Sequence, residues 1–243
     1  PPMDTVIGAD DRVIAISADD DTIHVSHQTE AELARALDES AVVEAPAHER
    51  SPERTLILGW NRRAPLILGE LDQYMVSGSA VTVVSELPDA ASQVEKQRAK
   101  LQNLTLSLRA GDTTDRTLLE ALDVPTYHHV IVLGNNDKLS AQEADAMTLI
   151  TLLHLRDIVE KHTPRPSIVS EMFDTRNREL AEVTRADDVI VGDKLVSQLL
   201  AQMAESPELL LDDLFNADGS EVYLRPAREY VRTGIPVSFH TVV

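Results

Sequence analysis

The chain has 243 residues, of which 43% are hydrophobic and 26% charged, as is usual for a soluble globular protein. It contains no cysteine, which excludes disulfides and thiolate metal sites. Its formal net charge of -19 disfavours nucleic acid as a partner, because the phosphates would repel it; an acidic surface or cation binding fits better. No run of about 18 apolar residues occurs, and the first residues lack the basic and apolar regions of a signal peptide.

The first 53 residues show little sustained pattern. Residues 13–17 alternate weakly and predict a short strand, within a β fragment that spans 1–26. Residues 27–53 are rich in Ala, Glu, His and Pro and indicate a linker. The chain begins abruptly, as a fragment of a longer protein would.

From Arg54 onward, apolar β-rich runs alternate with amphipathic helical stretches. Strands are predicted at 55–59, 81–85, 104–108, 129–134, 166–171 and 188–192, with helices near 63–76, 88–100, 115–122, 140–162 and 174–185. This alternation indicates an α/β fold with a parallel sheet covered on both faces. Six strands in about 140 residues match one complete doubly wound, Rossmann-like domain.

The first predicted strand ends in a turn with the pattern Gly59-x-Asn61-x-x-Ala64, where a dinucleotide-binding domain has G-x-G-x-x-G. Gly59 keeps the tight turn, and Ala64 is small enough for close packing of helix and strand. Asn61 replaces the glycine that lets the backbone approach a pyrophosphate. Arg62 and Arg63 add positive charge to a helix N-terminus, so an anion could still bind, although standard NAD geometry is disfavoured.

Other polar residues end the following strands and converge on the carboxyl edge of the sheet, the usual ligand crevice of this fold. Glu86 follows the second strand and Asp112 the third, although a helix N-terminal cap is the favoured interpretation of Asp112. Asn135 and Asp137 follow the fourth strand, in the sequence GNND. These residues, together with Gly59, Asn61, Arg62 and Arg63, are the predicted ligand or anion site.

Residues 194–217 predict two Leu-rich helices divided at Ser206-Pro207, and 219–231 and 235–243 return to short β patterns. Acidic residues near the end of the second helix are weak candidates for a Ca²⁺ site, with a solvated acidic surface as the alternative: Asp212, Asp213, Asp218 and Glu221.

Features of an enzyme are absent from the sequence. There is no Cys nucleophile, no G-x-S-x-G elbow and no H-E-x-x-H motif. The His128-His129 pair falls on a strand, where neighbouring side chains point to opposite faces, so the two cannot easily hold one ion. An oxidoreductase also needs a substrate domain, for which too little sequence is left. We therefore expect no catalytic activity.

Four stretches in order resemble the cytosolic region of Castor/Pollux-type ion channels: ILGWNRRAPLIL, VSEMFDTRNREL, DKLVSQLLAQMAESPELLLDDLF and GSEVYLRPAREYV. The compact, Arg-rich form resembles a bacterial homologue. That region carries RCK domains, regulators of K⁺ conductance with a Rossmann-like fold. The resemblance implies that 1–26 closes a preceding RCK unit and 27–53 is a linker. It further implies that 54–193 is the Rossmann-like subdomain, 194–218 the crossover helices, and 219–243 the start of a truncated C-terminal subdomain.

In RCK domains the crossover helices pair subunits, which would explain the excess of apolar residues there. The interface candidates that the resemblance implies are Leu195, Leu199, Leu200, Met203, Leu209, Leu210, Leu214 and Phe215. The alternative is an intramolecular core.

The resemblance implies a ligand-sensing gating-ring domain of a cation channel at the cytoplasmic face of the membrane. It would form a homodimer, or a tetrameric double ring in the full protein, attached to a pore domain of the same chain. The resemblance leaves the ligand unknown: the candidates are Ca²⁺ and a nucleotide (NAD or ATP), and Asn61 counts against the nucleotide. Two alternatives stay open: a nucleotide-binding regulatory subunit of a potassium uptake system, and an NAD(P)-dependent oxidoreductase.

Overall fold

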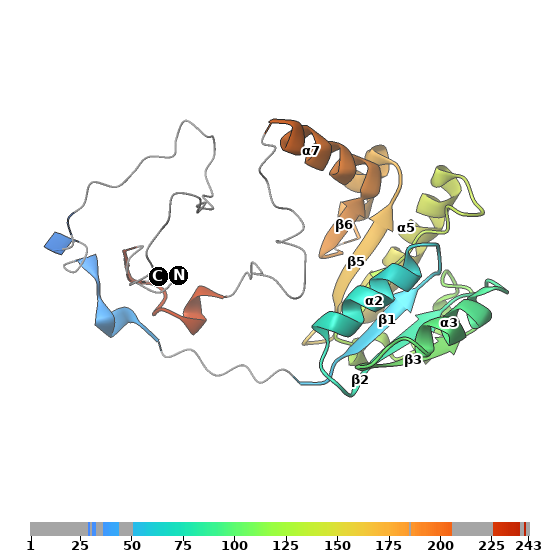
Figure 1. Ribbon diagram of the computed structural model, residues 1–243, viewed down its shortest axis with the longest axis horizontal. Coiled ribbons are helices and arrows are strands. Elements are labelled where there is room, and N and C mark those ends of the chain that lie inside the picture. Colours follow the sequence, from blue (N-terminus) through green and yellow to red (C-terminus); the bar gives the residue numbers. More distant parts are fainter. Residues whose placement is uncertain are drawn as a thin grey trace. The chain divides into compact units, whose positions relative to one another are not determined.

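The computed structural model describes residues 29, 31–32, 36–43, 51–184, 186–205, 226–238 and 241 (Figure 1). The chain divides into two units: Pro1–Ala47 with Leu224–Val243, and His48–Tyr223. The predicted strand at 13–17 and the second Leu-rich helix lie outside the described residues.

The central unit is built on a six-stranded, all-parallel sheet in the order β3-β2-β1-β4-β5-β6. All six predicted strands are confirmed, and their ends shift by no more than two residues. The strands are β1 (Arg54–Leu58), β2 (Ser79–Val84), β3 (Leu104–Arg109), β4 (His129–Val132), β5 (Ser167–Met172) and β6 (Asp188–Val191).

Helices connect and cover these strands. They are α2 (Ala64–Tyr74), α3 (Ala90–Arg98), α4 (Arg116–Ala121), α5 (Ala141–Val159), α6 (Arg178–Glu182) and α7 (Gly192–Glu205), with 3₁₀ turns at Val124–Thr126 and Thr175–Asn177. The start of α5 is fixed by a capping box: Ser140 Oγ accepts from the Glu143 N–H, and the Glu143 carboxylate accepts from the Ser140 N–H at 3.0 Å. The predicted helix at 174–185 is shorter than expected, since its first turn is 3₁₀.

Two hydrophobic clusters lie on the two faces of the sheet, because successive side chains of a strand point to opposite sides. Ile57 of β1 packs with Leu68 of α2 and Val94 of α3. Its neighbours Leu56 and Leu58 pack instead with residues of α5 such as Leu152, Leu155 and Val159. Figure 1 shows α2 and α3 in front of the sheet and α5 behind it. This double cover explains why the strands read as nearly continuous apolar runs.

The terminal unit joins the two ends of the chain. Val42 and Val231 form an antiparallel bridge, the Val43 N–H donates to Tyr230 O at 2.7 Å, and the Arg232 N–H donates to Ala41 O at 2.8 Å. Short 3₁₀ turns flank these contacts at Glu39–Ala41 and Ala227–Glu229. Residues 36–43, expected within a linker, thus pair with the C-terminal segment.

Among the helices of the described ranges, none has the length and apolar character needed to cross a membrane.

Candidate functional site

The candidate site lies where β1 pairs with β2 on one side and with β4 on the other. At this point the strand order reverses, which in doubly wound sheets opens a crevice at the carboxyl ends of the strands. Gly59, directly after β1, has φ of +97°, and a Cβ there would lie 2.2 Å from Leu133 O. Only glycine fits, so the tight turn predicted from the sequence is confirmed.

A cavity of about 350 Å³ opens beside this turn; we call it the switch-point cavity. Its wall is mostly apolar, and its polar groups come from the ends of β1 to β4 and from α5. Four predicted site residues line it: Gly59, Glu86, Asp112 and Asn135. The structure therefore brings these four together, while their ligand role stays a prediction.

For Asp112 the sequence offered a second role, as the N-terminal cap of a helix. Its Oδ1 accepts from the N–H and the hydroxyl of Thr114, at 2.8 and 2.7 Å. The cap of α4 is Asp115 instead, whose carboxylate accepts from the Thr117 N–H at 2.9 Å. The capping interpretation of Asp112 is thus wrong, and the residue stays on the cavity wall.

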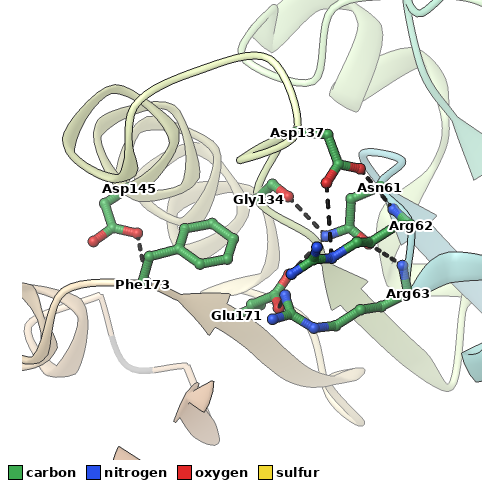
Figure 2. Close-up of polar contacts among 8 residues, drawn as sticks. All are labelled: Asn61, Arg62, Arg63, Gly134, Asp137, Asp145, Glu171 and Phe173. Atoms are coloured by element: carbon green, nitrogen blue, oxygen red, sulfur yellow. Dashed lines mark hydrogen bonds and ion pairs between the residues drawn. The ribbon is translucent and has the colours of Figure 1, made fainter. Parts of the chain in front are cut away.

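The other four predicted residues, Asn61, Arg62, Arg63 and Asp137, form a polar network with Glu171; we call these five residues the Asn61 network. Figure 2 shows the turn after β1 meeting the loop after β4 and the end of β5. The buried Asn61 amide donates to Gly134 O and to Glu171 Oε2, both at 2.8 Å. The Arg63 guanidinium forms an ion pair with the other oxygen of Glu171.

Backbone N–H groups at the start of α2 are also engaged within the network. The Arg62 N–H donates to Asp137 Oδ2 at 2.8 Å, and the Arg63 N–H donates to Asn61 Oδ1 at 2.9 Å. The Ala64 N–H donates to Asn61 O at 3.1 Å, and Pro65 has no N–H. A pyrophosphate bound in the usual way needs donors at this helix N-terminus. The N–H groups of Arg62, Arg63 and Ala64 are therefore engaged within the chain itself.

Glu171 holds the network together from the inside. Its side chain is 12% exposed, and burial raises the pKa of Glu171 above its usual value, although Arg63 and Asn61 favour the charged form. Phe173 follows two residues later. Its ring lies 5.9 Å from the Arg63 guanidinium and so close to Gly134 that a Cβ there would approach a ring carbon to 2.4 Å.

Sequence reasoning missed Glu171 and the buried Asp145 of α5. The Asp145 carboxylate accepts from the N–H groups of Phe173 and Asp174, at 2.9 and 3.0 Å, and from Asn177 Nδ2 at 2.8 Å. It thereby fixes the loop after β5 (Figure 2). Glu171 stands in an alternating strand pattern and Asp145 in a helical one, so only their polar character at inward positions could have indicated them.

The remaining candidates lie elsewhere. The proposed Ca²⁺ ligands Asp212, Asp213, Asp218 and Glu221, and the interface candidates Leu209, Leu210, Leu214 and Phe215, lie outside the described residues. Within the described ranges, no cluster of three or more metal-ligating side chains occurs. His128 and His129 lie at the start of β4 and make separate contacts: the former accepts from the Arg54 N–H, and the latter pairs with Glu53.

No protein-family profile matches the chain. It is 27% identical to a probable ion channel CASTOR of Oryza sativa subsp. japonica, over 98% of this chain and 30% of the channel. It is 26% identical to a probable ion channel POLLUX of Arabidopsis thaliana, over 100% of this chain and 33% of the channel. The chain thus spans about a third of the length of these relatives. Among solved structures, the human SLO3 gating ring matches 72% of this chain and 31% of its own, with a TM-score of 0.50 and 13% identity.

The parallel sheet, its order and the crevice at its switch point define a Rossmann-like domain with the fold found in the SLO3 gating ring. The similarity to the CASTOR and POLLUX channels extends over essentially the whole chain and agrees with the four stretches noted in the sequence. The chain is thus similar to Castor/Pollux-type ion channels, and its central unit has a Rossmann-like fold.

Proposed function

We propose that the chain is a ligand-sensing domain in the cytosolic gating ring of a cation channel, and that it has no catalytic role. The observation that carries this proposal is the similarity to ion channels over 98–100% of the chain. In the full-length protein, the domain would be attached to a membrane pore and would lie at the cytoplasmic face of the membrane.

Helix α7 supports a role in subunit pairing. Leu195, Val196, Leu200 and Met203 are 42–63% exposed, and with the half-buried Leu199 they follow the helical spacing of one face. This face therefore leaves a large part of its apolar surface exposed among the described residues. Burial of one such side chain stabilises an interface by about 1.5–3 kcal/mol, so a few of them suffice to hold two protomers together. Val196 was not among the residues expected from the sequence.

Gating requires that a ligand binds one arrangement of the subunits better than the other. A ligand with equal affinity for both arrangements shifts nothing, however tightly it binds. The switch-point cavity joins the ends of four strands and α5, so a ligand there contacts several elements at once. Ca²⁺ is the other candidate, and its proposed ligands are the acidic residues that follow α7 in the chain.

The two alternatives expect a nucleotide at the turn after β1. Both a nucleotide-binding subunit of a potassium uptake system and an NAD(P)-dependent oxidoreductase need phosphate donors there. The N–H groups of Arg62, Arg63 and Ala64 already donate within the Asn61 network. That observation favours the gating domain of a channel over either alternative.

Sedimentation velocity of the purified chain, with and without millimolar Ca²⁺, tests the oligomeric part of the proposal. We expect a dimer for the wild type and a monomer for Leu199→Asp with Leu200→Asp. Gln198→Asp with Ala201→Asp is the matched control, because it adds the same two charges to the opposite, exposed side of α7. A wild type that stays monomeric at all concentrations, or a double variant as dimeric as the control, would refute α7 as the interface.

A further inference from the structure

The turn after β1 contains a negative charge supplied by the chain itself. We propose that the Asp137 carboxylate is an internal anion that occupies the phosphate position of this turn, so that the switch-point cavity takes ligands without a phosphate group. The claim that a ligand in this cavity regulates the protein rests on the proposed function. The claim that Asp137 occupies the phosphate position rests on the geometry of the turn alone.

Both oxygens of Asp137 face Arg62. Oδ2 accepts the backbone N–H at 2.8 Å, and Oδ1 lies 3.9 Å from the guanidinium Nε. A backbone N–H at a helix N-terminus together with an arginine is the donor set that would hold a phosphate. Asp137 arrives from the loop between β4 and α5, whose position is fixed on the far side by the capping box of Ser140. The carboxylate is thus held in place by elements that need no ligand.

The charges of the Asn61 network are already balanced. Two carboxylates, Asp137 and Glu171, face two guanidinium groups, Arg62 and Arg63. A diphosphate would bring further negative charge next to both carboxylates, and the repulsion would be screened least at Glu171, which is only 12% exposed. It would also have to separate Asn61 from Arg63 and from Gly134. Phosphate is therefore excluded by charge and by occupancy together.

The polar residues at the switch-point cavity favour a ligand that donates hydrogen bonds. Glu86 and Asp112 line it, and one oxygen of the Asp112 carboxylate already accepts from Thr114. Asn135 Oδ1 is buried without a hydrogen-bond partner among the described residues. A buried acceptor without a partner is unfavourable, and a ligand N–H or O–H would satisfy it. The volume of about 350 Å³ lies at the lower end of the range for small-molecule sites. The ligand that fits is small, neutral or cationic, and rich in donors.

Calorimetric titration with ADP tests the internal anion directly. We expect no saturable binding of ADP to the wild-type chain. Asp137→Asn keeps an oxygen that can accept from the Arg62 N–H but removes the charge. We expect this variant to bind ADP with a dissociation constant at least tenfold below the weakest binding that the titration can detect. Asn61→Gly combined with Asp137→Ala opens the turn fully, and its ADP affinity should be higher still.

Asp115→Asn is the matched control, since Asp115 is also an aspartate whose carboxylate accepts a backbone N–H at a helix start. It should leave the wild-type result unchanged, and thermal unfolding checks that each variant is folded. Tight ADP binding by the wild type would overturn the internal anion but leave the gating proposal standing, with a nucleotide as its ligand. Folded Asp137 variants that still fail to bind ADP would also overturn the internal anion. A monomeric wild type in sedimentation velocity would count only against the gating proposal.

Discussion

Replacement of the buried Asp145 by alanine should strongly destabilise the central unit. The carboxylate is fully buried and accepts three hydrogen bonds, two of them from backbone N–H groups of Phe173 and Asp174. Asp145→Ala leaves these donors without a partner, at a cost of about 1–3 kcal/mol for each buried group. Two backbone donors and one amide donor, partly reached by solvent after relaxation, give a loss of about 3 kcal/mol.

Urea unfolding followed by circular dichroism measures this loss. With a slope of about 2 kcal/mol per molar urea, a loss of about 3 kcal/mol moves the midpoint down by about 1.5 M. Gln142→Ala, an exposed substitution in the first turn of the same helix, is the control and should change the free energy of unfolding by less than about 0.5 kcal/mol. A midpoint for Asp145→Ala within about 0.3 M of the wild type would refute the role of this carboxylate.

Two further predictions concern the turn and its network. Gly59→Ala places a Cβ against Leu133 O at positive φ and should destabilise the chain by about 2 kcal/mol or more, measured as a lower thermal midpoint; an unchanged midpoint would contradict the strained turn. Glu171→Gln removes a carboxyl whose pKa is raised in the folded state. In the wild type, this raised pKa contributes stability below the unfolded pKa, and that contribution is lost as the pH rises through the folded pKa. The stability of Glu171→Gln relative to the wild type should therefore rise between pH 4 and pH 7 in urea titrations, and a flat or falling difference would contradict the buried environment of Glu171.

The sheet could be predicted from the sequence because its signal is local. A run such as TLILG is apolar on both faces, and the polar residues and glycines that flank such runs mark their ends. The strand predicted at 129–134 ends at Val132, although the Leu133 N–H still donates to Leu58 O at 2.8 Å. Ends of elements depend on single hydrogen bonds, which a pattern of apolar residues does not specify.

The position of the site could also be predicted, since the carboxyl ends of parallel strands meet at one edge. Its internal pairing could not. Asn61 could be recognised as an obstacle to phosphate, but its bond to Glu171 joins residues 110 positions apart. A carboxylate such as Asp137 can either face a ligand site or accept hydrogen bonds from the turn itself. Which of the two occurs depends on the path of its loop, and tertiary packing sets that path.

The central claim is that the chain senses a ligand and transmits its binding to a pore. Current recordings of the full-length gene product in planar lipid bilayers test it most directly, with Ca²⁺ added on the side of the sensing domain. We predict that Ca²⁺ changes the open probability of the wild-type channel at least severalfold, and that Leu199→Asp with Leu200→Asp abolishes this response while leaving single-channel conductance unchanged. A channel whose double variant responds to Ca²⁺ as the wild type does, or a wild type whose open probability no cytosolic ligand changes, would contradict the account.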